Sequence, residues 1–241
     1  VEFLSYARQV VEQTNLLEER YKSHTETREL FSVSSQHYAF VVNAFVSLLK
    51  RADMTRYELF LRETRTYEII EDVKNFRSEI GVLFLNSYNR DVLTKMFDDN
   101  RLTYTSLFKA RPHIFVSKSN PLAKHEVVSL EDLEDFPYLS YDQGIHNSFY
   151  YSEEILSQIP HKKSIVVSDR ATLFNLLIGL DGYTIATGIL NSNLNGDNIV
   201  SIPLDIDDEI DIVYLKHEKA TLSKMGEKFL DNLVKEVTFD N

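Results

Sequence analysis

The chain has 241 residues, with 26 lysines and arginines against 37 aspartates and glutamates, so its formal net charge is −11. This length suits one large or two smaller domains, and a composition that is 43% hydrophobic is that of an ordinary globular protein. The absence of cysteine excludes thiol catalysis and cysteine-ligated zinc or iron–sulfur sites, and it leads us to expect a cytoplasmic protein. The acidic excess argues against a nucleic-acid surface on these residues, because phosphate contacts need clustered lysine and arginine.

The first 28 residues predict a long amphipathic helix. Apolar side chains recur at sevens, as in Phe3, Val10 and Leu17, and neither Gly nor Pro interrupts them. This spacing is typical of a coiled-coil seam. Two interpretations remain open, namely a linker and dimerisation helix or a helix docked on the core of its own subunit. Because the chain begins at Val1 rather than Met, we expect the natural N-terminus to lie further upstream.

From residue 29 onward, short β-rich runs alternate with helical patterns. The run Ile80–Leu85 is continuously apolar, as expected of a strand buried in a parallel sheet. Such alternation predicts βαβ units with helices on both faces of each sheet, and no apolar run is long enough to span a membrane. In this half, we predict strands at Leu30–Val33, Tyr57–Arg62 and Ile80–Leu85, and helices over 38–49, 69–76 and 92–97.

The second half repeats the scheme, with tight turns at Asp181-Gly182 and Asn195-Gly196. Together the two halves predict an α/β protein of two lobes joined by two crossing segments. The predicted strands are Ile114–Val116, Tyr138–Tyr141, Ser164–Ser168, Tyr183–Thr187, Ile199–Leu204 and Ile210–Leu215, and the predicted helices are 147–159, 169–179 and a last one over 222–237.

No sequence motif points to catalysis. Phosphate-binding glycine loops and a nucleophile elbow are absent, and the seven histidines show no metal-binding spacing. We therefore expect no enzyme, no cofactor and no metal, although a metal site assembled only in three dimensions stays open. Two acidic segments, 125–161 and 205–211, allow acid–base chemistry, but a solvated surface is the favoured interpretation because charge runs normally stay hydrated.

Polar residues follow several predicted strands and precede helices. Helix N-termini present free N–H groups that favour small anions, and ligands of open α/β sheets bind at the carboxyl ends of strands. The alternative is that these side chains only cap helices. The residues concerned are Ser34, Ser35, Gln36 and His37 after the first strand, Ser168 before the 169–179 helix, and Thr187 after the strand that follows it.

Four stretches in this order resemble LysR-type transcriptional regulators. FLSYARQVVEQTNLLEERY is similar to the family's linker helix, and LFSVSSQHYAFVVNAFVSLL is similar to the first unit of its effector-binding domain. NPLAKHEVVSLEDLEDFPYLSY and VVSDRATLFNLLIGLDGYTIATGIL resemble two later units. The resemblance covers essentially the whole chain. The family's winged helix-turn-helix would precede the linker, so we expect the DNA-binding domain to be missing from this chain.

The resemblance implies a two-lobed fold of the type 2 periplasmic binding protein kind, in which each lobe is a mostly parallel sheet flanked by helices. It implies a linker helix at 1–28, a first lobe at 29–110 and 213–241, and a second lobe at 111–212. It also implies a homodimer or homotetramer that contacts promoter DNA only through the missing domain.

The resemblance further implies a small-molecule effector, such as a carboxylate or an amino-acid-like compound, bound between the lobes. The family's ligand positions correspond to Ser34, Gln36, His37 and Ser168, and strand-end placement adds Ser35, Thr64, Asn86 and Thr187. Effector binding would then change the lobe and oligomer geometry to control transcription. A solute-binding receptor of a transporter has the same two-lobe fold and remains the alternative.

Overall fold

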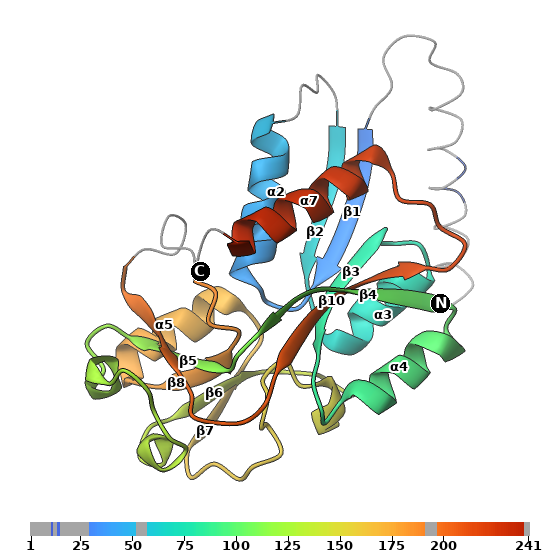
Figure 1. Cartoon of the computed structure of the whole chain (residues 1–241). Coiled ribbons are helices and arrows are strands. Elements are labelled where there is room, and N and C mark those ends of the chain that lie inside the picture. Colours follow the sequence, from blue (N-terminus) through green and yellow to red (C-terminus); the bar gives the residue numbers. More distant parts are fainter. Residues whose placement is uncertain (1–10, 12–13, 15–28, 52–56, 191–196, 239–241) are drawn as a thin grey trace.

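Two five-stranded sheets form the body of the protein in the computed structural model, one above the other in Figure 1. The structure describes Val11, Thr14 and residues 29–51, 57–190 and 197–238. The helix predicted over 1–28 lies outside the described residues, apart from Val11 and Thr14.

The first sheet is mixed, with strand order β2-β1-β3-β10-β4. Strand β1 pairs in parallel with β2 and β3, whereas β10 runs antiparallel to both β3 and β4. The expected mostly parallel sheet is therefore only its β2-β1-β3 half. The strands are β1 (Glu29–Ser35), β2 (Tyr57–Glu63), β3 (Ile80–Leu85), β4 (Leu102–Ala110) and β10 (Ile210–His217).

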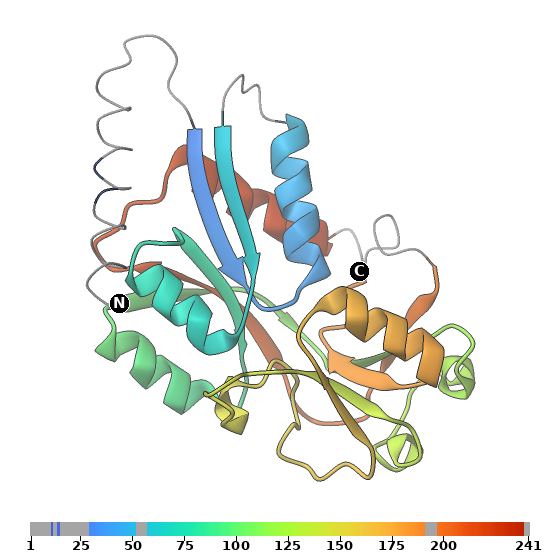
Figure 2. The same cartoon turned by 180° about the vertical axis from the view of Figure 1, so that it is seen from behind.

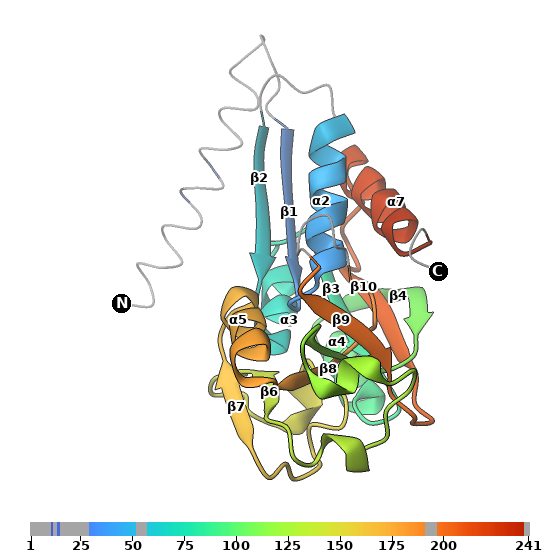
Figure 3. The same cartoon turned by 90° about the vertical axis from the view of Figure 1, so that its left-hand side faces the viewer.

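Helices cover both faces of the first sheet, as Figures 1 and 3 show. Helices α2 and α7 pack against each other on one face, and α3 and α4 lie on the other. The bounds are α2 (Ala39–Arg51), α3 (Thr66–Lys74), α4 (Arg90–Asp99) and α7 (Lys224–Thr238).

Strand β3 is apolar throughout because both of its faces are buried. Val82 and Phe84 pack on the side of α2 and α7, while Leu83 and Leu85 pack on the side of α3 and α4. At Gly81, a Cβ atom would approach Ile69 Cγ2 to 2.8 Å and Val73 Cγ2 to 2.9 Å. Glycine therefore allows α3 to lie close against this strand.

The second sheet has the order β7-β6-β8-β5-β9 and is also mixed. Strand β6 is parallel to β7 and β8, and β5 is antiparallel to β8 and β9. Helix α5 (Arg170–Leu180) packs on it through Leu173 and Leu177, and Figure 2 shows this helix from the opposite side. The strands are β5 (His113–Ser117), β6 (Tyr138–Tyr141), β7 (Ser164–Val167), β8 (Tyr183–Ala186) and β9 (Ile199–Pro203).

The chain passes between the sheets twice, from β4 to β5 and from β9 to β10. The two passages meet where the Leu204 N–H donates to the Pro112 carbonyl at 3.0 Å. The two-lobed α/β architecture is confirmed. Each predicted strand or helix in the described residues corresponds to an observed one, except the helix predicted over 147–159. The lobe boundaries at 29–110 with 213–241 and at 111–212 stay a prediction.

Two elements differ from the predictions. Strand β4, which completes the first sheet, had no predicted counterpart. The helix predicted over 147–159 is wrong, because this segment contains only the 3-10 helix η3 (Phe149–Tyr151), followed by turns. Three consecutive side chains, Glu153, Glu154 and Ile155, are buried there. A helix on the protein surface buries only one face, and three consecutive residues, which point about 100° apart, do not lie on one face.

Candidate ligand-binding site between the two sheets

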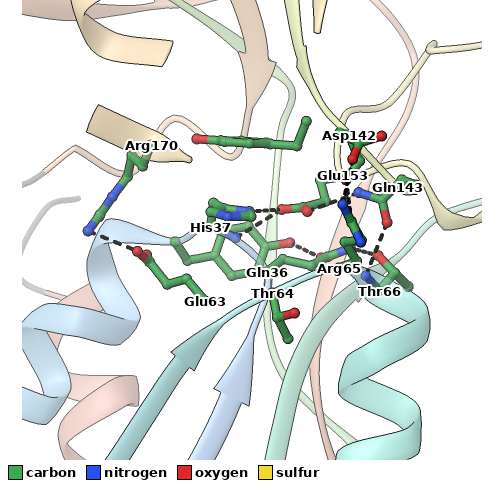
Figure 4. A network of polar contacts seen from close by, with 12 residues as sticks. Gln36, His37, Glu63, Thr64, Arg65, Thr66, Asp142, Gln143, Glu153 and Arg170 are labelled. Atoms are coloured by element: carbon green, nitrogen blue, oxygen red, sulfur yellow. Dashed lines mark hydrogen bonds and ion pairs between the residues drawn. The ribbon is translucent and has the colours of Figure 1, made fainter. Parts of the chain in front are cut away.

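The carboxyl ends of β1 and β2 face the second sheet, and the residues that follow them form a polar network with it (Figure 4). The network follows from topology, because β1 and β2 are parallel neighbours whose ends lie at the same edge. The participants from the first sheet are Gln36, His37, Glu63, Arg65 and Thr66, and those from the second are Asp142, Gln143, Glu153 and Arg170.

The centre of this network is His37 with Glu153. The backbone N–H of His37 donates to Glu153 Oε2 at 2.9 Å, and the His37 Nδ1 lies 2.8 Å from the same oxygen. Gln143 Nε2 donates to Glu153 Oε1 at 3.0 Å. The His37 and Glu153 side chains are only 7% and 3% exposed, so this carboxylate is held by three polar groups away from solvent.

The environment of His37 favours its charged form. Burial alone would lower the pKa of the imidazole, but the hydrogen bond and the negative charge of Glu153 outweigh burial and raise the pKa above its ordinary value. Tyr141 stacks on the imidazole, with ring centroids 4.1 Å apart and planes 9° apart. Together these contacts fix the orientation of the ring.

Three further contacts join the two sheets around this centre. Arg65 Nη2 lies 2.6 Å from Asp142 Oδ2, and the Thr66 N–H donates to Gln143 Oε1 at 3.1 Å. Arg170 Nη2 lies 3.4 Å from Glu63 Oε1, and burial raises the pKa of Glu63 although the charge of Arg170 opposes this. The Arg65 pair is more than one third exposed on each side and adds little stability, whereas the Glu63 pair is mostly buried.

A cavity of about 50 Å³ lies beside His37, and we call it the inter-sheet cleft. This is too small for a metabolite, because ligand pockets are usually about 300–1,000 Å³. The side chains of Tyr141 and Glu153 line the cleft, so part of the space between the sheets is filled by the protein itself. The lining comprises His37, Tyr38, Ala39, Phe40, Phe84, Phe115, Tyr141, Glu153, Glu154, Ile155, Arg170, Leu173, Phe174, Thr184, Ile185, Ala186, Thr187, Ile189 and Ile210.

Two of the predicted site residues, His37 and Thr187, line the cleft. Gln36 lies next to it but is fully engaged, because its Nε2 donates to Thr66 Oγ1 at 2.6 Å and its Oε1 accepts from Tyr38 and from the Phe84 N–H. The structure therefore brings three predicted residues together at one place.

The neighbouring predicted residues have other surroundings. The Ser34 hydroxyl points into the layer between sheet and helix, where it donates to Asp72 Oδ2 at 2.7 Å and lies 2.7 Å from Ser78 Oγ. The Ser35 hydroxyl is buried without a hydrogen-bond partner among the described residues, and its carbonyl accepts from the Thr64 N–H at 2.9 Å. The Thr64 hydroxyl donates to Glu68.

Asn86 and Ser168 lie outside the lining of the cleft. Asn86 Oδ1 accepts from the N–H groups of Tyr88 and Asn89 at 3.1 Å each, and its Nδ2 donates to Asp208 at 3.0 Å, so it orders the turn before α4. Ser168 is exposed before α5, and the N-cap of that helix is Asp169, whose side chain accepts from the Thr172 N–H. The role of all eight predicted residues in ligand binding stays a prediction.

The sequence interpretation missed Gln143, Glu153 and Arg170. Glu153 and Glu154 were assigned to a solvated acidic segment, and this assignment is wrong, since both residues are buried. Burial raises the pKa of Glu154 well above its ordinary value. The signal that could have found Arg170 was its position at the start of the helix predicted over 169–179, two residues after Ser168.

In the described part of the chain, no helix combines the length and apolar character that a membrane crossing requires. Within the same residues, no three His, Asp or Glu side chains lie together in a way that could hold a metal ion.

The sequence and the fold were compared with those of known proteins. The family model described as "LysR substrate binding domain" matches residues 34–238. Comparison of the sequence with curated proteins returns no match.

Several solved structures are similar in fold. Full-length CbnR complexed with its target DNA is 13% identical over 98% of this chain and 80% of its own, with a TM-score of 0.65. HinK, a LysR family transcriptional regulator from Pseudomonas aeruginosa, is 14% identical over 98% and 79%, with a TM-score of 0.56. The effector binding domain of QuiR in complex with shikimate is 16% identical over 87% and 97%, with a TM-score of 0.57. At these identities the likeness concerns the fold alone.

Proposed function

Because the chain belongs to the LysR substrate-binding domain family, we propose that it senses a small metabolite carrying a carboxylate group in the inter-sheet cleft and thereby controls transcription. The proposal assigns His37 and Thr187, which line the cleft, to effector contacts. It assigns no catalytic step to the chain.

The observation that carries this proposal is the carboxylate of Glu153 held by His37. The backbone N–H and the Nδ1 of His37 both lie within 2.9 Å of one carboxylate oxygen, in a buried setting where charge-assisted hydrogen bonds are strong. An effector carboxylate of similar geometry would take the place of Glu153. Displacement of Glu153 and Tyr141 would also enlarge the cleft of about 50 Å³.

The regulatory step follows as a population shift. His37 belongs to the first sheet and Glu153 to the second, so replacing their contact by an effector changes what holds the sheets together. The two arrangements of the sheets, with and without the contact between His37 and Glu153, are in equilibrium. The effector shifts this equilibrium only as far as its affinities for the two arrangements differ. In an oligomer, such a shift changes the relative placement of the subunits.

Contact with promoter DNA is assigned to a part of the regulator outside this chain. The net charge of −11 leaves few clustered cations for phosphate contacts. The similar CbnR structure is a full-length protein in complex with its target DNA. A specific, saturable gel shift by this chain alone would contradict the assignment.

The proposal is tested by a thermal-unfolding screen of amino acids and small carboxylates, each paired with its primary amide. A true effector at about 100 times its Kd should stabilise the protein by about 2.7 kcal/mol, and its amide should have no effect. A hit should lose most of its affinity in His37→Gln and keep it in His125→Gln, because His125 is exposed. An amide that binds as well as its acid would contradict carboxylate recognition.

The transport-receptor alternative is separated from the proposal by the oligomeric state. A regulator of this kind is expected to form dimers or tetramers, and a transport receptor is expected to be a monomer. Light scattering that gives a strict monomer at micromolar concentration would count against the regulatory proposal.

A further inference from the structure

A second cavity, of about 230 Å³, lies in the half of the molecule that contains the second sheet. One part of its lining comes from the segment 156–162, in which 156–159 ends the helix predicted over 147–159 and forms turns instead. Strand β8 and the 3-10 helix η2 (Glu131–Leu133) also contribute to the lining. The cavity is lined by Leu130, Glu131, Leu133, Glu134, Phe136, Leu156, Ile159, Pro160, His161, Lys162, Tyr183 and Ile185.

The lining is mainly apolar, and the size of the cavity suits one ring. Leu133 is buried, and Phe136, Leu156, Ile159 and Ile185 complete an aliphatic and aromatic wall. A cavity of about 150 Å³ with such a wall is known to bind benzene in another protein. A volume of about 230 Å³ therefore accommodates a monocyclic molecule with a small substituent.

One end of the cavity is polar. His161 lines it, with its Nδ1 3.0 Å from the Tyr183 hydroxyl, and its buried Nε2 has no partner among the described residues. The ring of Tyr138, which lies outside the lining, stacks on His161 with ring centroids 3.8 Å apart. Buried polar groups are normally hydrogen-bonded, so the Nε2 of His161 lacks a partner that a ligand could supply.

The charges around the cavity favour an uncharged ligand. Burial lowers the pKa of His161, so the imidazole is neutral near pH 7. At the rim, Lys162 Nζ already lies 2.5 Å from Glu134 Oε2, and Glu131 adds a further negative charge. An anion would meet this acidic rim without a free cation at the polar end.

Leu156, on the wall of the cavity, has a backbone φ of +59°. This left-handed conformation is unfavourable for a bulky residue and is often found at binding sites. Leu156 directly follows Glu153, Glu154 and Ile155, which line the inter-sheet cleft.

We propose that this cavity is a second ligand site, which takes an uncharged monocyclic molecule carrying one hydroxyl or carbonyl group. The ring fills the apolar part, and the polar group bonds to the His161 side. Ile185 lines both this cavity and the inter-sheet cleft, so a ligand here contacts the wall of the effector site without occupying it.

The test uses phenol as the probe, with benzoate as its charged counterpart and toluene as its apolar counterpart. In calorimetry on the whole chain, phenol should bind saturably at millimolar concentration and at least about tenfold more tightly than benzoate or toluene. In methyl NMR spectra, phenol should shift the resonances of Leu133, Ile159 and Ile185, while those of Ile189 and Ile210 in the cleft should move less. Shifts centred on Ile189 and Ile210, or no saturable binding, would overturn the proposal.

Two substitutions sharpen the test. Ile159→Trp should fill the cavity and weaken phenol binding at least about tenfold, whereas Ile178→Trp, on the exposed side of α5, should leave it unchanged. His161→Phe keeps a ring against Tyr138 and should remove the preference for phenol over toluene. Should a variant fail to fold, the methyl shifts of the wild-type protein still decide the question. Phenol affinity that is unchanged in folded Ile159→Trp would contradict the assignment.

Discussion

The imidazole of His37 and the carboxylate of Glu153, which are 116 residues apart in sequence, lie 2.8 Å from each other between the two sheets. The backbone N–H of His37 donates to the same oxygen at 2.9 Å. The contact is buried on both sides, so the loss of either partner leaves an unpaired polar or charged group inside the protein. This relationship leads to the first two predictions.

Substitution of Glu153 by alanine should create a binding place for small carboxylates. Glu153→Ala leaves the His37 donors without an acceptor, and we expect it to lower the unfolding free energy by about 3 kcal/mol. Acetate should restore part of this loss in a saturable manner, measured by thermal unfolding at constant ionic strength with chloride as reference. The exposed Glu126→Ala variant serves as control. An equal response to acetate in both variants would refute the prediction.

The contribution of His37 to stability should decrease as the pH rises. Its pKa in the folded protein is raised, so the charged imidazole stabilises the fold fully below the unfolded pKa of about 6.5 and less as the pH passes the folded pKa. The difference in unfolding free energy between wild type and His37→Gln, measured with urea from pH 5 to 9, should therefore shrink with pH. A difference that grows with pH would show that Glu153 does not govern the titration of His37.

Substitution of Glu154 by glutamine should increase the unfolding free energy, most of all above neutral pH. Burial raises its pKa well above the ordinary value, Oε1 accepts from the Tyr141 N–H, and Oε2 has no hydrogen-bond partner in the described residues. A group with a raised pKa contributes stability that is present below about pH 4.3 and is lost as the pH rises.

Glu154→Gln resembles the protonated acid at every pH. We expect its unfolding free energy to exceed that of the wild type, and by more at pH 8 than at pH 5. Urea unfolding of both proteins at the two pH values measures this. The prediction fails if the gain is equal at both, or if the exposed Glu126→Gln variant shows the same gain.

Substitutions of Ser34 and Ser168, two of the three serines predicted to contact the effector, should differ in their effect on stability. Ser34 bonds to Asp72 and Ser78 in the buried layer, so Ser34→Ala should cost about 1–3 kcal/mol of unfolding free energy. Ser168 is exposed, and Ser168→Ala should change stability by less than about 0.5 kcal/mol.

Calorimetry with an effector found in the screen then tests their predicted role in binding. If Ser34→Ala binds the effector as the wild type does while losing stability, Ser34 acts only in the fold. Weaker binding in Ser168→Ala without loss of stability would place Ser168 at the ligand.

Some strands and site positions were predictable from the local sequence, because the residue pattern of a segment reflects how that segment is buried. Ile80–Leu85 is apolar at every position since both of its faces are covered, and its bounds are identical to those of β3. The segment 34–37, at the end of β1, was predicted to bind the ligand, and it provides His37 in the cleft. Local periodicity reports how one segment is buried, and this information is contained in the segment itself.

The sequence by itself determined the alternation of strands and helices, the family resemblance and the exclusion of chemistry that requires cysteine. Only the tertiary structure decided that Glu153 and Glu154 are buried rather than solvated, and that the Ser34 hydroxyl bonds to Asp72 and Ser78. It also decided that 147–159 contains only a 3-10 helix and turns. The physical reason is that these features depend on contacts between distant segments, such as His37 with Glu153. The energy of such a contact depends on the partner that the fold supplies, and no spacing within either segment encodes it.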